Sequence, residues 1–421
     1  MHVAIVWHSY PTANRGDTLI AYELIKELSR KGHKVTLLTY SERSCASDDP
    51  ILRKMVHEFV FVNRDTKKLN GTFGLILPAL ESAVSDPFHL GSHFMSYYFS
   101  QSMKNAIYSY LRSNELDAIV FSSGMGVMAP RSMPCSVVMP LDVVSEGCKQ
   151  NSLREDSKWA KLFWWAMYLK MRIYERLIYP RFDTAVFVSE WDARIAKRNA
   201  PELRVSVLSL GADLDMFNPS EKANDVSTIL FFGNLSSHTN EEAVIYFIKE
   251  VFPLVRASVP EAQLELIGAS PSPKTQMIAV KTPNISVLGF VEDLPTRISE
   301  ATVIVAPMLS GTGTKTKVLH AMAAGKPVVA TSIAVNGIVC EDGRDILIRD
   351  SPMSFATGII SLLIDKEFSR RIGENARMTI ERNHSWQAFC EGLLDIIGYD
   401  SGLTGVASEG EDSSDIKKEI G

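Results

Sequence analysis

The chain has 421 residues, of which 46% are hydrophobic and 22% are charged, a composition typical of a soluble globular protein with two domains. The net charge is −5, and residues 401–421 alone contribute −3, so the chain lacks the basic excess that nucleic-acid binding requires. Its five cysteines are scattered and show no C-x-x-C spacing, which favours a reducing compartment.

The start of the chain carries no signal for secretion. Residues 2–7 read directly as a strand, without a basic leader before a cleavable apolar core, and nowhere do about 18 uninterrupted apolar residues occur. We therefore expect a cytoplasmic protein that does not span a membrane.

The first forty residues predict a βαβ unit. Residues 2–7 and 34–40 are apolar strand patterns, and residues 18–31 between them have helical periodicity. The first loop contains a single glycine, Gly16, instead of a G-x-G-x-x-G fingerprint. A nicotinamide site is therefore poorly supported, although Glu42 follows the second strand as a ribose-binding acid would.

Three further strands continue this sheet at residues 57–62, 117–121 and 135–139. Asp142 follows the last of them, and α/β proteins gather their polar chemistry at such strand ends. We predict a role for Asp142 in the site, with an ordinary loop aspartate as the alternative.

Residues 156–182 mix aromatic and basic side chains at helical spacing. One interpretation is an interfacial segment that makes a peripheral membrane contact. The other is a helix packed on the sheet, with its basic side chains extending from the edges. We favour packing, because the acids Glu155, Asp156 and Glu175 weaken the membrane interpretation.

A polar linker at residues 220–224 separates the first series of elements from a second one. Asp213 and Asp215 precede this linker and form a D-x-D pair, a spacing at which two carboxylates can bind a metal ion. Such a pair should lie within a single nucleotide-binding domain. Metal binding is therefore the minority interpretation.

Residues 303–331 predict a strand, a glycine-rich turn, a helix and another strand. Lys315 and Lys317 lie in the first turn of the helix, where the backbone already concentrates about half a positive charge. Together with the amides and hydroxyls of residues 311–314, they form a plausible phosphate cradle. The alternative is a tight turn with two solvated lysines.

The segment Gly311–Thr331 resembles the donor-binding signature of the family 4 retaining glycosyltransferases, and it is closest to a bacterial branch that assembles exopolysaccharides. The family carries two glutamates eight positions apart in this segment, where this chain has Thr312 and His320. The resemblance implies the GT-B fold, an α/β architecture of two Rossmann-like, doubly wound parallel-sheet domains that face a cleft.

The resemblance also implies the domain organisation. Residues 1–219 form an N-terminal acceptor domain, to which a C-terminal helix at 385–398 returns. Residues 225–384 form the domain that binds the nucleotide-sugar donor. Residues 400–421 are rich in Gly, Ser and acids and read as a disordered acidic tail.

The site residues follow from the resemblance and from the need to neutralise a leaving diphosphate without a metal ion. We assign Lys317, Lys315 and Asp142 to catalysis. We assign these residues to donor binding: Gly16, Asn234, His238, Asn240, Gly289, Phe290, Gly311, Thr312, Gly313, Thr314 and His320. Asn234 and His238 stand where the broad family has basic residues, which places more of the phosphate charge on the two lysines.

The implied reaction moves a sugar from a nucleotide diphosphate sugar to an acceptor hydroxyl with retention of configuration, without a metal ion or other cofactor. The acceptor is a sugar, a lipid-linked molecule or a small molecule, and the setting is polysaccharide or glycoconjugate assembly in the cytoplasm or at the inner face of the cell membrane. Two alternatives stay open. One is a degenerate GT-B protein that binds a nucleotide sugar or a partner, and the other is a GT-B nucleotide-sugar epimerase.

Overall fold

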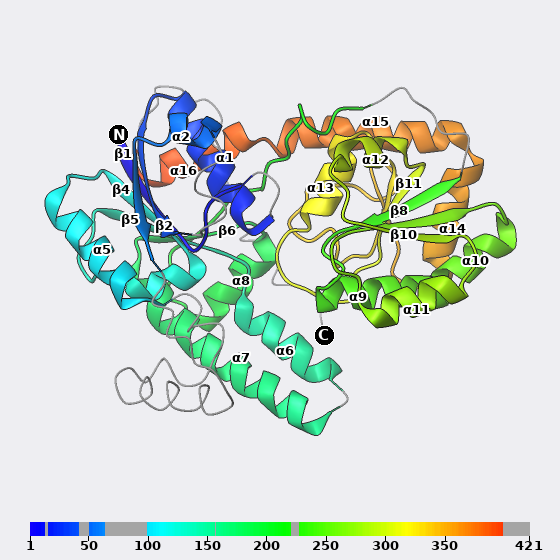
Figure 1. Ribbon diagram of the computed structural model, residues 1–421, viewed down its shortest axis with the longest axis horizontal. Coiled ribbons are helices and arrows are strands. Elements are labelled where there is room, and N and C mark those ends of the chain that lie inside the picture. Colours follow the sequence, from blue (N-terminus) through cyan, green and yellow to red (C-terminus); the bar gives the residue numbers. More distant parts are fainter. Residues whose placement is uncertain (13–15, 42–49, 64–98, 156, 220–226, 399–421) are drawn as a thin grey trace, which may run out of the picture.

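The structure is a computed structural model that describes residues 1–12, 16–41, 50–63, 99–155, 157–219 and 227–398. Two parallel sheets organise these residues, one in each half of the molecule (Figure 1). The first has the strand order β3-β2-β1-β4-β5-β6-β7, and the second has the order β10-β9-β8-β11-β12-β13.

The strands of the first sheet are β1 (His2–Trp7), β2 (Lys34–Tyr40), β3 (Glu58–Val62), β4 (Ala118–Ser122), β5 (Cys135–Leu141), β6 (Thr184–Phe187) and β7 (Val205–Val207). Those of the second are β8 (Thr228–Phe232), β9 (Gln263–Ile267), β10 (Ile285–Gly289), β11 (Val303–Ala306), β12 (Val328–Ala330) and β13 (Leu347–Ile348).

The helices of the first half are α1 (Gly16–Arg30), α2 (Pro50–Met55), α5 (Gln101–Ser113), α6 (Val144–Arg154), α7 (Lys158–Ile178) and α8 (Glu190–Asn199), with short 3₁₀ turns at Ser123–Met128 and Tyr179–Arg181. Those of the second half are α9 (His238–Tyr246), α10 (Phe252–Ser258), α11 (Pro273–Lys281), α12 (Leu294–Glu300), α13 (Thr316–Ala323), α14 (Pro352–Ile364) and α15 (Lys366–Asn383), with a π turn at Phe247–Val251.

The central strand β1 shows why the first sheet is parallel and covered on both faces. Val3 pairs with Val35 of β2 on one side and with Ala118 of β4 on the other, both in parallel register. Val3 and Ile5 belong to one apolar core, whereas their neighbour Ala4 belongs to a second core on the opposite face. Strands buried on both faces read as continuous apolar runs, which is the pattern of α/β proteins. The predicted α/β fold of two doubly wound parallel sheets is confirmed.

The last helix, α16 (Trp386–Ile396), contacts α1 in the first half. Figure 1 shows α15 running along the second half and α16 lying beside α1. An ion pair of 2.8 Å joins Lys31, which follows α1, to Glu391 of α16. The chain therefore crosses between the two halves twice. The domain boundaries near residues 219 and 225 and the acidic tail at 400–421 stay predictions, because residues 220–226 and 399–421 lie outside the described residues.

His384 joins the two crossings of the chain. Its side chain is fully buried, and its Nε2 accepts a hydrogen bond of 3.0 Å from the backbone N–H of Val339. The other ring nitrogen, Nδ1, is therefore the protonated one and donates to the carbonyl of Leu210 at 2.9 Å. One neutral imidazole at the end of α15 thus bonds to Leu210, in the segment that leads out of the first half, and to Val339, in the loop after β12.

The aromatic and basic segment at 156–182 is largely the helix α7, which packs on α6. The favoured packing interpretation holds for one face of α7, which buries Met171, Tyr174 and Ile178. In the described part of the chain, no helix is both long and apolar enough to cross a bilayer.

Candidate functional site

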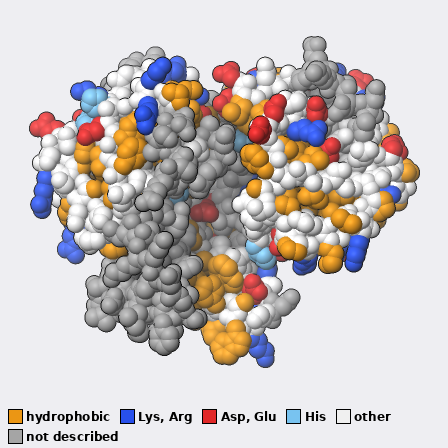
Figure 2. Space-filling model, viewed as in Figure 1, with side chains coloured by type: hydrophobic (Ala, Val, Ile, Leu, Met, Phe, Trp, Pro, Cys, Tyr) orange, Lys and Arg blue, Asp and Glu red, His pale blue; other side chains and the backbone are white. Residues whose placement is uncertain are grey.

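A cavity of ≈ 360 Å³ lies where the two halves of the molecule meet, at the carboxyl ends of strands from both sheets. Figure 2 shows the molecule hollowed between its two halves. The cavity is lined by Asp142, Gly147, Gln150, Asn151, Thr239, Asn240, Met308, Gly311, Thr312, Thr314, Lys315, Thr316 and Lys317. The open edge of a parallel sheet is where ligands bind in α/β proteins.

The glycine-rich loop after β11 forms one wall of this cavity. Gly311 and Gly313 have φ of 116° and 69°, a backbone region that residues with a Cβ rarely occupy. The Nζ of Lys315 donates to the carbonyls of Thr312 and Gly313 at 2.5 and 3.0 Å. Lys315 therefore stabilises the conformation of the loop through these two hydrogen bonds, and it also places a positive charge beside the loop.

Lys317 lies in the same wall, in the first turn of α13. Its Nζ donates to the Oδ1 of Asn240 at 2.7 Å and lies 4.1 Å from the centre of the Phe231 ring. Burial, with the neighbouring charge of Lys315, lowers the pKa of Lys317 to about 7. An anion in the cavity would restore its positive charge.

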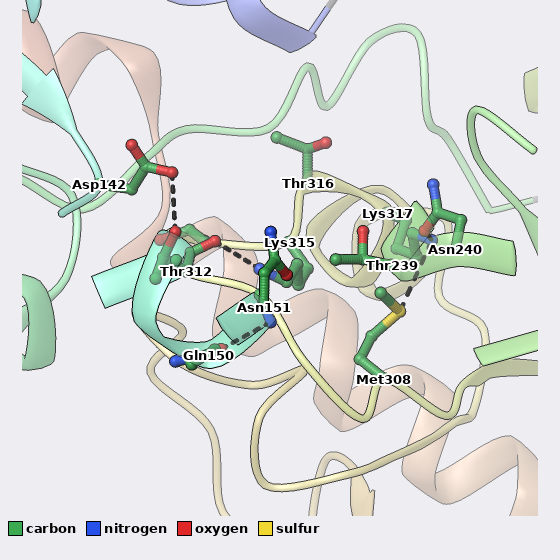
Figure 3. Close-up of a pocket in the computed structure, with 13 residues that line it drawn as sticks. Asp142, Gln150, Asn151, Thr239, Asn240, Met308, Thr312, Lys315, Thr316 and Lys317 are labelled. Atoms are coloured by element: carbon green, nitrogen blue, oxygen red, sulfur yellow. Dashed lines mark hydrogen bonds between the residues drawn. The ribbon is translucent and has the colours of Figure 1, made fainter. Parts of the chain in front are cut away.

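Asp142 faces this wall from the first half of the molecule (Figure 3). Its Oδ2 accepts a hydrogen bond of 2.9 Å from the hydroxyl of Thr312. Burial raises the pKa of Asp142 to about 6, and the nearby charge of Asp192 adds to the effect. Asp142 is thus mostly ionised at pH 7, but it takes up a proton at a higher pH than an ordinary aspartate does. Such a shift is common for carboxylates that bind or react with a ligand.

Side chains of the first half also contact the glycine-rich loop directly. The backbone N–H of Gly311 donates to the Oε1 of Gln150 at 3.2 Å, and the hydroxyl of Thr314 donates to the carbonyl of Val188 at 3.1 Å. Arg154 of α6 forms an ion pair of 2.9 Å with Glu242 of α9 across the same boundary. The backbone N–H of Gly313 also donates to the carboxylate of Asp192. Two amides of the predicted cradle are therefore capped by side chains of the protein itself, although the cavity above the loop is open.

Comparison with known proteins agrees with this geometry. Residues 226–365 match the family model described as Glycosyl transferases group 1. An uncharacterized 44.6 kDa protein in the cps region of Klebsiella pneumoniae is 23% identical over 388 residues, which cover 89% of this chain and 94% of that protein.

Solved structures resemble the whole described architecture. Sucrose-phosphate synthase from Thermosynechococcus elongatus has a TM-score of 0.68 at 14% identity, covering 94% of this chain and 98% of that one. Anabaena HepE, solved in complex with UDP and glucose, has a TM-score of 0.62 at 11% identity, covering 93% of this chain and 98% of that one. The chain has the GT-B fold. Together with the family match, this supports a GT-B glycosyltransferase.

The GT-B cleft does not bring every predicted residue to the cavity. His238 is exposed and lines a different hollow with Glu241 and Lys274. The Oδ1 of Asn234 accepts hydrogen bonds from the backbone and hydroxyl of Ser236, in its own turn. Neither side chain lies among those that line the cavity beside Lys317.

Two further predicted positions lie at the end of β10. Gly289 has a φ of 71°, and the Phe290 side chain is 75% exposed, outside the lining of the cavity. The remaining position, Gly16, begins α1, and its surroundings lie outside the described residues. The predicted contacts of these residues with the donor stay predictions.

His320 stands at a position where the family has a glutamate, and here it packs against the chain itself. Its ring stacks on that of Phe217, with centroids 4.2 Å apart and planes 15° from parallel. Burial lowers the pKa of His320 to about 4, so the ring is neutral at physiological pH. This contact favours packing for His320, whereas its predicted contact with ribose stays untested.

The D-x-D pair also has a local role. The Oδ1 of Asp213 accepts hydrogen bonds from the backbone N–H groups of Asp215 and Met216, at 3.1 and 2.8 Å. Asp213 thus closes its own turn ahead of the linker.

Sequence reasoning missed Gln150, Asn151 and Arg154 of α6. Gln150 and Arg154 bond to the donor half, and Asn151 lines the cavity. It also missed the steric role of Gly233, which lies between β8 and α9. A Cβ on Gly233 would lie 2.9 Å from the Nζ of Lys317. A glycine directly after a strand in an α/β protein was the available signal for a close approach.

A second cavity of ≈ 560 Å³ adjoins the first within the GT-B cleft. Both are lined by Asp142, Gly147, Asn151 and Thr312. The second cavity has polar groups at the strand ends, including His8 and Ser122, and apolar side chains from α6 and α7. Asp142 therefore stands at the boundary between a basic cavity and a mostly apolar one.

Proposed function

We propose that the chain is a retaining glycosyltransferase that moves a sugar from a nucleotide diphosphate sugar to an acceptor hydroxyl. The observation that carries this proposal is the interdomain cavity, in which Lys315, Lys317 and the glycine-rich loop face Asp142. It is the only site among the described cavities that pairs buried positive charge with a carboxylate at a GT-B cleft.

The donor half supplies what a leaving diphosphate needs. The start of α13 carries a partial positive charge, and Lys315 and Lys317 lie at its first turn. In a site largely removed from water, these charges stabilise an anion more strongly than they would in solvent. We expect the reaction to need no metal ion or other cofactor, because these groups neutralise the developing charge.

The acceptor half supplies a second place to bind. The cavity of ≈ 560 Å³ holds the acceptor, and its hydroxyl meets the donor sugar near Asp142, where the two cavities adjoin. Asp142 is placed to accept a hydrogen bond from that hydroxyl. The retaining outcome rests on the resemblance of residues 311–331 to retaining enzymes. The anomeric configuration of the product, read by NMR, tests it.

The biological setting follows from the same comparisons. HepE binds UDP and glucose, and one relative lies in a cps region, so we propose a nucleotide such as UDP in the donor and a role in polysaccharide or glycoconjugate assembly. We place the protein in the cytoplasm or at the inner face of the cell membrane.

The decisive experiment has two steps. A thermal-shift screen of nucleotide sugars identifies the donor, since a ligand that binds only the native state raises the melting temperature. Turnover of that donor by wild type and by Lys317→Ala is then compared. We expect Lys317→Ala to lower kcat at least about 100-fold, the order of loss on removing one stabilising donor. Near-normal turnover would contradict the proposal.

The same thermal-shift and turnover assays test a second candidate function, binding of a nucleotide sugar without catalysis. Thr312 and His320 replace the two glutamates of the family signature, and Thr312 donates to Asp142 across the cleft. A degenerate GT-B protein that binds a nucleotide sugar without catalysis would show the thermal shift but neither transfer nor donor hydrolysis.

A further inference from the structure

The solvent face of α7 carries a continuous line of large apolar side chains. Its members follow one another at three- or four-residue spacing, which places them on one side of a helix: Trp159, Leu162, Trp165, Leu169, Ile173 and Leu177. Trp159 is 82% exposed, and the others are between 37% and 54% exposed. We call this set the apolar stripe. Figure 2 shows hydrophobic side chains gathered near the start of α7 on this view.

The apolar stripe is not part of the helix's packing face. Met171, Tyr174 and Ile178 form that face and are buried against the rest of the first half. A surface helix of a globular protein normally has polar residues opposite its buried face. A line of six large exposed apolar side chains is therefore a candidate interaction site.

The charges on α7 indicate what the partner is. The basic residues Lys158, Lys161, Arg172 and Arg176 are exposed along the helix. The one acidic residue of α7, Glu175, points inward and accepts hydrogen bonds from the backbone and hydroxyl of Ser145 at 2.9 and 2.5 Å. The outer surface of the helix is therefore apolar and basic. This combination complements an anionic lipid surface, in which apolar groups enter the interface while basic groups meet the headgroups.

The position of α7 relative to the site supports the same partner. Phe163, Trp164 and Met167 of α7 line the larger cavity, whose other wall reaches Asp142. Phe163 is also 54% exposed, so the wall of the cavity continues to the outer surface of the helix. Figure 1 shows α6 and α7 projecting together from the first half, beside the gap between the two sheets.

We propose that α7 docks the protein on an anionic lipid bilayer through the apolar stripe and its basic neighbours. The larger cavity then opens toward the bilayer, where it can take an acceptor hydroxyl carried by a lipid. The docking stands on the surface of α7 alone, whereas the lipid-carried acceptor rests on the proposed function.

Vesicle flotation with the full chain tests the docking, with mixed phosphatidylcholine and phosphatidylglycerol vesicles compared with pure phosphatidylcholine vesicles. The double variant Leu162→Ser/Trp165→Ser removes apolar contact and should bind the mixed vesicles at least about tenfold more weakly. The matched control Met277→Ser/Val280→Ser alters exposed apolar residues of α11 and should float as wild type does.

A second variant tests the electrostatic part. Lys161→Gln/Arg172→Gln should bind about 25-fold more weakly at low salt, because each basic residue near an anionic surface contributes about fivefold. Wild type should bind mixed vesicles more tightly than pure phosphatidylcholine, and added salt should reduce that difference. Wild type that stays unbound to mixed vesicles, or that floats equally with the stripe variant, would overturn the proposal.

Two further measurements on the stripe variant would show whether a second copy of the chain, or another part of the same chain, covers the apolar stripe instead of a bilayer. A wild-type dimer that becomes monomeric in Leu162→Ser/Trp165→Ser, measured by light scattering, would assign the stripe to a second copy. A large fall in the free energy of unfolding of this variant would show that residues of the same chain cover it. Neither result affects the nucleotide thermal shift, which tests the proposed function separately because Leu162 and Trp165 line neither cavity.

Discussion

At the scale of single residues, Lys317 is the group whose charge depends most on the ligand. Its ammonium contacts Asn240, Phe231 and the sulfur of Met308, and among the described residues no carboxylate forms an ion pair with it. Burial lowers its pKa to about 7, so at pH 8 most molecules carry it neutral. A diphosphate in the cavity favours the charged form and raises this pKa.

We therefore expect nucleotide-sugar binding at pH 8 to take up a proton at Lys317. Calorimetric titration in two buffers of different ionisation enthalpy measures this uptake. Lys317→Arg is the control, because a guanidinium stays charged at this pH. Asp142, whose pKa is about 6, could also take up a proton when the ligand binds. Any such uptake is the same in Lys317→Arg, so the difference between the two proteins reports Lys317 alone. Equal uptake by the variant and wild type would show that Lys317 is not the group that titrates.

At the scale of elements, the turn between β8 and α9 must pass very close to α13. Gly233 has a φ of 149°, and a Cβ there would lie 2.9 Å from the Nζ of Lys317 and 3.2 Å from the Nδ2 of Asn240. Gly343 offers a matched control, since its φ is 77° and a Cβ there would meet nothing within 4 Å.

We expect Gly233→Ala and Gly343→Ala both to lose about 1–3 kcal/mol of stability from backbone strain. Only Gly233→Ala should weaken nucleotide-sugar binding, by at least about tenfold, because it displaces the lysine. Thermal unfolding and calorimetric titration of both variants measure the two effects. Wild-type affinity in Gly233→Ala would show that the lysine tolerates displacement.

At the scale of the whole molecule, the two halves are joined at the crossings around His384. The imidazole bonds to Leu210 and Val339, while the backbone carbonyl of His384 accepts from the N–H of Ala212 at 3.0 Å. Because burial lowers the pKa of His384, the neutral tautomer that makes both ring bonds is favoured.

His384→Ala should lower the free energy of unfolding by about 2–4 kcal/mol, since it removes two hydrogen bonds and leaves a cavity. Asn383→Ala changes the exposed neighbour and should cost less than about 0.5 kcal/mol. Urea unfolding measures both. If the two variants unfold alike, the junction does not depend on this histidine.

Much of the fold could be read from the chain because its signals are local. The apolar run of β1, the helical period of α1 and the glycine-rich turn before α13 each depend on residues adjacent in sequence. The crowding of Lys315 and Lys317 at a helix start likewise pointed to an anion site. Their partners, such as Asn240 and Phe231, required the fold, because these residues approach α13 from other elements.

The sequence by itself determined the two α/β halves and the lysine pair at the start of a helix, because hydrophobic period, turn glycines and helix-end charge act over a few neighbouring residues. The return of the last helix to the first half was implied by the resemblance. Only the tertiary structure decided that α6 would reach the glycine-rich loop, that His320 would stack on Phe217, and that α7 would leave an apolar stripe facing outward. These outcomes depend on packing between residues far apart in the chain. A local pattern shows that a helix has an apolar face but not which element covers it.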